Sequence, residues 1–215
     1  MADSDISRTL PSITQGNLLR FTERFLSDKA AEQARSNAGD IDPVLAKWDE
    51  WFVANSDLAR LCRVQQHLET ELMRNCASPV VEIPLPGSKD LFLAHTEDEI
   101  DAVLKGEELD SERNRAKEQL RTRCSAWNAA DEIVGYSRAK KTEEEASDVE
   151  FRLVEELWAM PAQSVLAAAG KVHSIVRHGA PKVDIDDFPW PAMRLLLADL
   201  LVMSGAAPFT PAACQ

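Results

Sequence analysis

The chain has 215 residues and a formal net charge of −12, with 45% hydrophobic and 28% charged residues. That length can bury a sizeable core, and the composition is typical of a folded protein rather than a disordered one. The negative charge argues against nucleic acid or an anionic membrane as a direct partner, because both repel an acidic surface. Aromatic residues make up only 6%, fewer than an all-β sandwich usually needs, so a helical protein is expected.

The first residues, the longest apolar run and the cysteines bear on location. Residues 1–5 (MADSD) lack the basic and apolar regions of a signal peptide. The longest apolar run, Leu195–Met203, contains Asp199 and has about half of the ~20 residues that span a bilayer. The four cysteines (Cys62, Cys76, Cys124 and Cys214) form no C-x-x-C pair. A cytoplasmic protein with free thiols and no membrane contact is therefore expected.

The N-terminal third predicts a tail and two helices. Residues 1–16 have no sustained apolar period, which predicts a flexible tail. Asn17 can cap a helix over 17–35. A longer helix is predicted over Pro43–Asn75, because Asp42 is a good N-cap and proline is tolerated at the first helical position.

The long helix carries an apolar seam with alternating gaps of three and four residues, as in a coiled coil. Its members are Trp51, Ala54, Leu58, Leu61, Gln65, Leu68 and Leu72, with Gln65 as a polar interruption. A helix that long would expose its seam to water if it stood alone. We therefore expect it to pack against a second long helix.

The segment 76–95 differs from its surroundings because its prolines and Gly87 are incompatible with a helix. It predicts two short extended pieces or a small hairpin within 80–93. Thr96 and Glu99 then form a capping-box pattern that opens a short helix ending near Gly106.

The second long helix is predicted over 110–139, from apolar or small residues three or four positions apart. A capping-box pattern at Thr142–Glu145 predicts the start of another helix, and two more are predicted over 161–177 and 192–203. Residues 204–215 predict a second flexible tail. The predicted fold is all-α: a single helical domain over 17–203, whose centre is an antiparallel, coiled-coil-like hairpin of 43–75 against 110–139. Shorter helices pack on this hairpin, and 76–95 form a proline-rich insertion.

Acidic residues are concentrated in two segments that flank the second long helix. Residues 97–112 hold eight acids and one lysine, and residues 143–156 hold seven acids and one arginine. The start of the helix between them is basic, with Arg113, Arg115, Lys117, Arg121 and Arg123. We expect these cations to be drawn toward acids on neighbouring helices.

The sequence contains no pattern that predicts catalysis or a cofactor. Nucleotide-binding and hydrolase motifs are absent, and the four histidines (His67, His95, His173 and His178) lack the spacing of metal ligands. We therefore assign no catalytic, cofactor-binding or metal-binding residue, and expect no cofactor and no enzymatic activity.

Two groups of residues are candidates for a partner surface. Trp48, Trp51 and Phe52 span neighbouring faces of the long helix, and they form either the end of the core or a surface that binds a partner. Glu143, Glu144 and Glu145 either imitate nucleic-acid phosphates or only place negative charge at the start of a helix.

The C-terminal part resembles a group of known proteins. Met160-Pro161-Ala162-Gln163-Ser164 begins a helix rich in small residues, and Asp187-Phe188-Pro189-Trp190-Pro191 begins the last one. Over residues 140–203 the chain resembles short helical bacterial proteins of unknown function, often encoded near prophage or mobile-element genes. The resemblance implies no known activity.

The function that these observations favour is a non-catalytic interaction or regulatory protein that self-associates through its long helices. The first alternative is an acidic decoy that inhibits a basic nucleic-acid-binding protein. The second is a small enzyme whose site assembles from dispersed residues. A deep pocket beside a desolvated histidine or glutamate would favour the enzyme.

Overall fold

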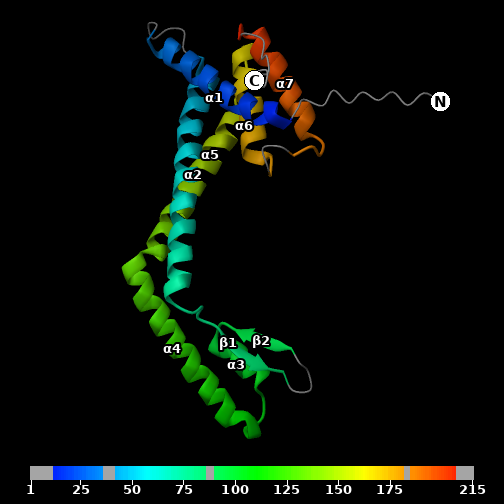
Figure 1. Ribbon diagram of the computed structural model, residues 1–215. Helices are drawn as coiled ribbons and strands as arrows, with labels where there is room; N and C mark the ends of the chain where they lie inside the picture. Colours follow the sequence, from blue (N-terminus) through cyan, green and yellow to red (C-terminus); the bar gives the residue numbers. More distant parts are fainter. Residues whose placement is uncertain (1–11, 36–41, 86–89, 182–184, 207–215) are drawn as a thin grey trace, which may run out of the picture. The chain divides into compact units, whose positions relative to one another are not determined.

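The computed structural model describes residues 12–35, 42–85, 90–181 and 185–206 (Figure 1). These residues are mostly helical, which confirms a broadly all-α fold. The elements in chain order are α1 (Ser12–Arg35), α2 (Pro43–Asn75), β1 (Val81–Pro84), β2 (Leu91–Ala94), α3 (Glu97–Val103), the 3₁₀ helix η1 (Glu107–Leu109), α4 (Asp110–Val134), α5 (Tyr136–Ala159), α6 (Val165–Gly179) and α7 (Trp190–Met203).

Contacts divide the chain into two compact units, whereas the sequence predicted a single domain over 17–203. Unit 1 comprises residues 1–57 and 147–215, and unit 2 comprises residues 58–146. The physical reason is that the buried apolar side chains form two separate clusters, one within each unit.

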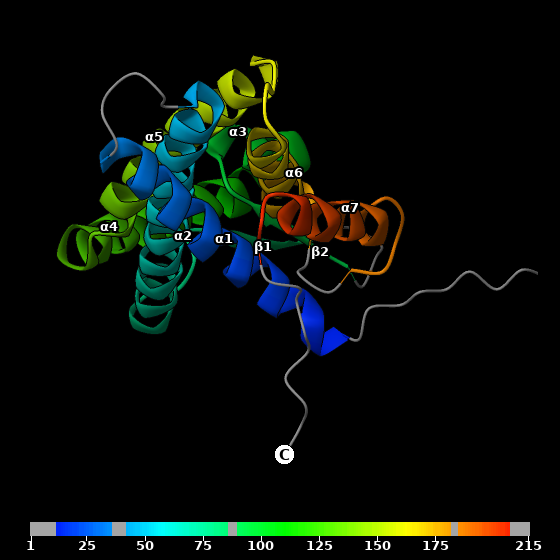
Figure 2. The ribbon, with the colours of Figure 1, turned by 90° about the horizontal axis from the view of Figure 1, so that it is seen from above.

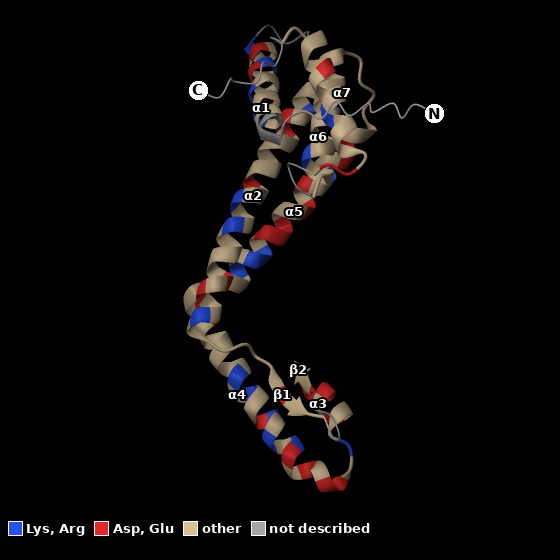
Figure 3. Ribbon diagram, turned by 45° about the vertical axis from the view of Figure 1, so that its right-hand side comes forward, with Lys and Arg blue, Asp and Glu red and all other residues tan. Residues whose placement is uncertain are grey.

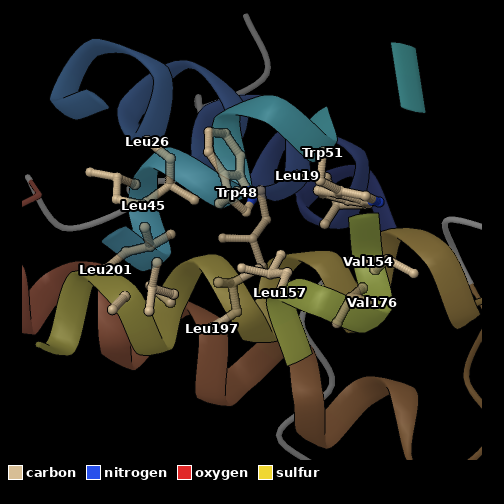
Figure 4. Close-up of a cluster of buried hydrophobic side chains, with 14 of the residues drawn as sticks. Leu19, Leu26, Leu45, Trp48, Trp51, Val154, Leu157, Val176, Leu197 and Leu201 are labelled. Atoms are coloured by element: carbon tan, nitrogen blue, oxygen red, sulfur yellow. The ribbon is translucent and has the colours of Figure 1, made fainter. Parts of the chain in front are cut away.

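The core of unit 1 collects side chains from five helices (Figure 4). Trp48 and Trp51 of α2 lie in it with no exposed surface, beside leucines of α1, α5 and α7. Helices α6 and α7 lie side by side, as Figures 1 and 2 show. Helix α6 also lies close to α2: a β-carbon at Gly170 of α6 would lie 3.3 Å from the Trp48 ring of α2. The close approach of α2 and α6 therefore favours glycine at position 170.

One aspartate connects the first turns of two helices in unit 1. Asp42 Oδ1 accepts hydrogen bonds from the backbone amides of Val44 and Leu45, so Asp42 caps α2 as predicted. Its other oxygen, Oδ2, accepts a 2.6 Å hydrogen bond from Ser164 Oγ, and Ser164 caps α6 by accepting from the amide of Ala167. The starts of α2 and α6 are therefore held together by their own caps.

Helix α2 has the predicted bounds, and within each unit its side chains bond to α5. Lys47 pairs with Glu156 in unit 1, and Cys62 donates to Glu143 in unit 2. The apolar seam of α2 is shielded from water along its length: Trp51 and Leu72 are buried, and the seam positions between them are half-buried.

The predicted pairing of 43–75 with 110–139 stays unconfirmed. Helix α4 packs mainly on α3, β1 and η1. Its own extent also differs from the prediction, because Gly135 adopts φ 83° and ends α4. Helix α5 then begins at once, at Tyr136, and Thr142 lies inside it. The Thr142 hydroxyl donates to the carbonyl of Arg138 one turn earlier, so the predicted capping box at Thr142–Glu145 is wrong.

Unit 2 contains the small hairpin that the sequence predicted as one of two options. Strands β1 and β2 pair antiparallel, with Val81 opposite Ala94 and Ile83 opposite Phe92. The predicted capping box at α3 is confirmed: Thr96 Oγ1 accepts from the Glu99 amide, and the Glu99 side chain accepts from the Thr96 amide. The buried side of β1 packs on Ala116 and Leu120 of α4, which forms the core of this unit.

Three helix starts differ from the predictions. Helix α1 begins at Ser12, so residues 12–16 are helical rather than part of a tail. Helix α6 begins at Val165 and α7 at Trp190. The predictions for residues 1–11, for 207–215 and for Cys214 lie outside the described residues; the other three cysteines are free thiols. Among the helices that the structure describes, none is long and apolar enough to cross a bilayer.

Candidate functional site

Helices α2, α5 and α6 of unit 1 bring a set of polar side chains together around one buried carboxylate. Glu150 of α5 is 3% exposed, and its Oε1 atom accepts hydrogen bonds from three side chains. Trp51 Nε1 donates at 2.6 Å and Asn55 Nδ2 at 3.2 Å, both from α2. His178 Nδ1, from α6, also lies 3.2 Å from this oxygen and donates to it, because a carboxylate only accepts.

His178 is a partly exposed member of this group. Its side chain is 27% exposed, and the Trp158 ring meets its imidazole edge-on at 5.5 Å. Arg177, the preceding residue, donates from Nε to Asn55 Oδ1 at 3.3 Å, which fixes the orientation of the asparagine amide. The carboxylate thus holds the indole, the amide and the imidazole of two other helices in one arrangement.

A second histidine, His173, is fully buried one turn earlier in α6. Its Nδ1 accepts a 3.2 Å hydrogen bond from Trp48 Nε1. Its Nε2 lies 3.8 Å from Glu23 Oε1 of α1, too far for a direct hydrogen bond, and both of these atoms are buried without a hydrogen-bond partner. Burial lowers the pKa of His173; the Glu23 carboxylate opposes this shift and Arg177 adds to it.

We call these eight side chains the polar network: Glu23, Trp48, Trp51, Asn55, Glu150, His173, Arg177 and His178.

A histidine held by a buried carboxylate is an arrangement that enzymes use to orient a base. The Ser174 hydroxyl of α6 is engaged elsewhere, since its Oγ accepts from Trp158 Nε1 and donates to the Lys171 carbonyl. The described residues also contain no group of three or more His, Cys, Asp or Glu that could hold a metal ion. The hydrogen bonds and ion pairs of the network connect α1, α2, α5 and α6.

The first predicted partner surface lies in the core instead. Trp48 and Trp51 are fully buried, and Phe52 is half-buried with its ring stacked on Trp48 at 5.2 Å. Burial of the two indoles favours the first alternative, the end of the core, and a partner surface at these residues stays a prediction.

The second predicted surface, the three glutamates at 143–145, is largely engaged with neighbouring side chains. Glu143 accepts from the Cys62 thiol at 3.3 Å, and burial raises the pKa of that thiol, as does the Glu143 carboxylate. Glu144 and Glu145 lie 3.9 and 3.8 Å from lysines one turn earlier in α5.

Two acids of α3, Glu97 and Asp101, contact cations of α4, as the sequence predicted for the basic residues there. Figure 3 shows where acidic and basic residues lie along these two helices. Arg121 makes a bidentate contact with Glu97, at 2.8 and 2.9 Å, and this contact lowers the pKa of the Glu97 carboxyl. Lys117 lies 2.7 Å from Asp101. The charge of this acidic segment is therefore partly neutralised within unit 2.

An exposed apolar face on α7 was not recognised in the sequence. Leu196 is 45% exposed and Met203 70%, and Leu195 and Val202 are also exposed. The four residues share one face of the helix with Asp199, because each of them lies three or four positions from Asp199. The opposite face, with Leu197 and Leu201, is buried against the core. The sequence signal was the apolar run Leu195–Met203. A helix with apolar side chains on all sides is shielded from water only when other protein surfaces pack on every side.

No protein-family model, no curated protein and no solved structure matches the chain, so the resemblance of residues 140–203 to helical bacterial proteins remains an expectation.

Proposed function

We propose that this chain is a non-catalytic interaction protein that binds another protein through the exposed face of α7. The observation that carries the proposal is the set of Leu195, Leu196, Val202 and Met203 on one side of a helix whose other side is anchored in the core. Contiguous apolar side chains at the surface are typical of sites where proteins associate. A helix that presents such a row fits an apolar groove on a partner.

The face also indicates the chemistry of the partner. Completing the burial of four half-exposed side chains contributes about 1 kcal/mol each, or about 4 kcal/mol in total. A micromolar complex needs about 8 kcal/mol, so the interface must extend beyond these residues. Asp199 is exposed near the middle of the face. If two copies paired symmetrically through this face, the two Asp199 carboxylates would approach each other. A different protein, with a basic residue opposite Asp199, fits better.

Self-association through the long helices, together with a coiled-coil hairpin, remains a weaker proposal. The covered seam of α2 reduces the apolar surface that α2 could offer to a second copy. The acidic decoy is also less well supported, because many of the carboxylates in 97–112 and 143–156 contact cations or are buried.

The test is capture of partners by the tagged full chain from its native cell, followed by binding measurements with the purified partner. Leu196→Glu places a charge in the face and is expected to weaken binding at least 30-fold. Ile133→Glu is the matched control, since Ile133 is 86% exposed on α4 and lies in the other unit. Equal binding by the wild type and both variants would contradict the proposal.

A further inference from the structure

The outer edge of β1 in unit 2 has backbone groups that β2 does not use. The amide of Leu85 donates to the carbonyl of Asp90 at 3.2 Å, and this bond identifies which residue pairs of β1 and β2 are hydrogen-bonded. Hydrogen-bonded residue pairs recur at every second position of two antiparallel strands. Ile83 is therefore hydrogen-bonded to Phe92, and Val81 to Ala94. The N–H and C=O of Glu82 therefore point away from β2. Within the part of the chain that the structure describes, neither group has a hydrogen-bond partner.

A cavity of about 180 Å³ lies beside this strand. One wall is β1 itself, with Leu104 next to it, and the other is one face of α4, made by Glu112, Arg115, Ala116 and Gln119. That volume equals the share of about six liquid water molecules, enough for one side chain. An open strand edge and a helix thus border one cavity.

The helical wall carries a cation that stands out from its neighbours. Arg113, Lys117 and Arg121 of α4 each contact acids of the 97–110 segment, and Arg123 donates to the carbonyl of Val80. Arg115 is exposed and has no ion pair among the described residues. It is therefore available to a carboxylate that enters the cavity.

We propose that this groove binds an extended peptide segment, which pairs with the open edge of β1 as an added strand. The main chain of the peptide would donate to and accept from Glu82, and Pro84 supplies a further outward carbonyl but no N–H. An apolar side chain would enter the cavity against Leu104 and Ala116. Alternate side chains of a strand point to the same side, so an acidic residue two positions away would reach Arg115. The expected ligand is an extended peptide with an apolar-x-acidic pattern.

The experiment selects ligands from a displayed library of random eight-residue peptides, using the full chain as bait. We expect peptides with the apolar-x-acidic pattern to be enriched. Gln119→Trp fills the groove from an exposed position of α4 and should weaken the selected peptides at least tenfold. Asn114→Trp makes the same kind of change at an exposed position of α4 outside the cavity and should leave their affinity unchanged.

Hydrogen exchange of the wild-type protein reads the strand pairing directly and needs no variant. The Glu82 amide is expected to exchange rapidly in the free chain and at least tenfold more slowly with a selected peptide bound. No enrichment, or peptides that leave Glu82 exchange unchanged, would overturn the proposal, as would peptides that bind a folded Gln119→Trp variant as tightly as the wild type. This groove uses no residue of α7, so its failure would leave the proposed function standing.

Discussion

Replacing Glu150 with alanine is expected to destabilise unit 1 by about 3–5 kcal/mol. A hydrogen bond to a charged group contributes about 1.5–3 kcal/mol, and the strongest one here is the 2.6 Å bond from Trp51. Trp51 has no exposed surface, so its indole N–H would stay buried without an acceptor, which costs a further ~1–3 kcal/mol. Asn55 and His178 are partly exposed and can bond to water instead, so their losses add little.

The assay is urea unfolding followed by tryptophan fluorescence in a Trp127→Phe background. Trp127 is the one tryptophan in unit 2, so the remaining four report on unit 1. Glu150→Gln keeps an acceptor for Trp51 and is expected to cost only about 1–2 kcal/mol. Glu155→Ala, at an exposed position of the same helix, should change the free energy of unfolding by less than about 0.5 kcal/mol.

A double-mutant cycle isolates the contact itself. Combining Trp51→Phe with Glu150→Ala removes donor and acceptor together, and we expect a coupling energy of about 1.5–3 kcal/mol. A loss below about 1 kcal/mol for Glu150→Ala, or no coupling in the cycle, would refute the view that this carboxylate holds α2 and α6 to α5.

Three further predictions follow from the structure. Burial lowers the pKa of His173, so its contribution to stability is complete above the ordinary pKa of 6.5 and is lost as the pH falls below it; an NMR titration of the imidazole that gave 6.5 or higher would contradict this. Asp42→Ala removes a cap shared by α2 and α6 and should cost about 1–2 kcal/mol in urea unfolding, whereas Asp28→Ala at an exposed position of α1 should cost less than about 0.5 kcal/mol. Gly135→Ala places a side chain at φ 83° and should destabilise unit 2 by about 1 kcal/mol; an unchanged urea midpoint would show that α4 and α5 do not need this turn.

Local signals in the sequence predicted local structure well. Asp42 with Pro43 marked the start of α2, and Thr96 with Glu99 marked the start of α3, because these side chains bond to amides within their own first turn. Prolines that exclude a helix predicted extended structure within 80–93, with a hairpin as one of two options, and the structure shows the hairpin. Gly135 was missed as a helix end because no proline follows it and helix-compatible residues continue on both sides, and the left-handed conformation is visible only in the structure.

The polar network could not be predicted, because its members come from four helices that are far apart in sequence. Glu150 looked like one acid in a charged segment, and His173 and His178 looked like unrelated side chains. Their burial depends on how α1, α2, α5 and α6 pack, which the spacing of any single helix does not encode. The separation of the buried side chains into two clusters was not visible in the sequence either, because the apolar seam of α2 continues from Trp51 to Leu72 with only Gln65 as a polar interruption.

Photo-crosslinking in the native cell determines whether the exposed face of α7 binds a partner protein. A photoreactive phenylalanine derivative would replace Val202 in this face or, in a separate variant, the exposed Ile133 of α4. We expect position 202 to crosslink one specific protein, position 133 not to crosslink it, and Leu196→Glu to abolish the crosslink. The same set of crosslinked proteins from both positions, or a crosslink that persists with Leu196→Glu, would contradict this expectation.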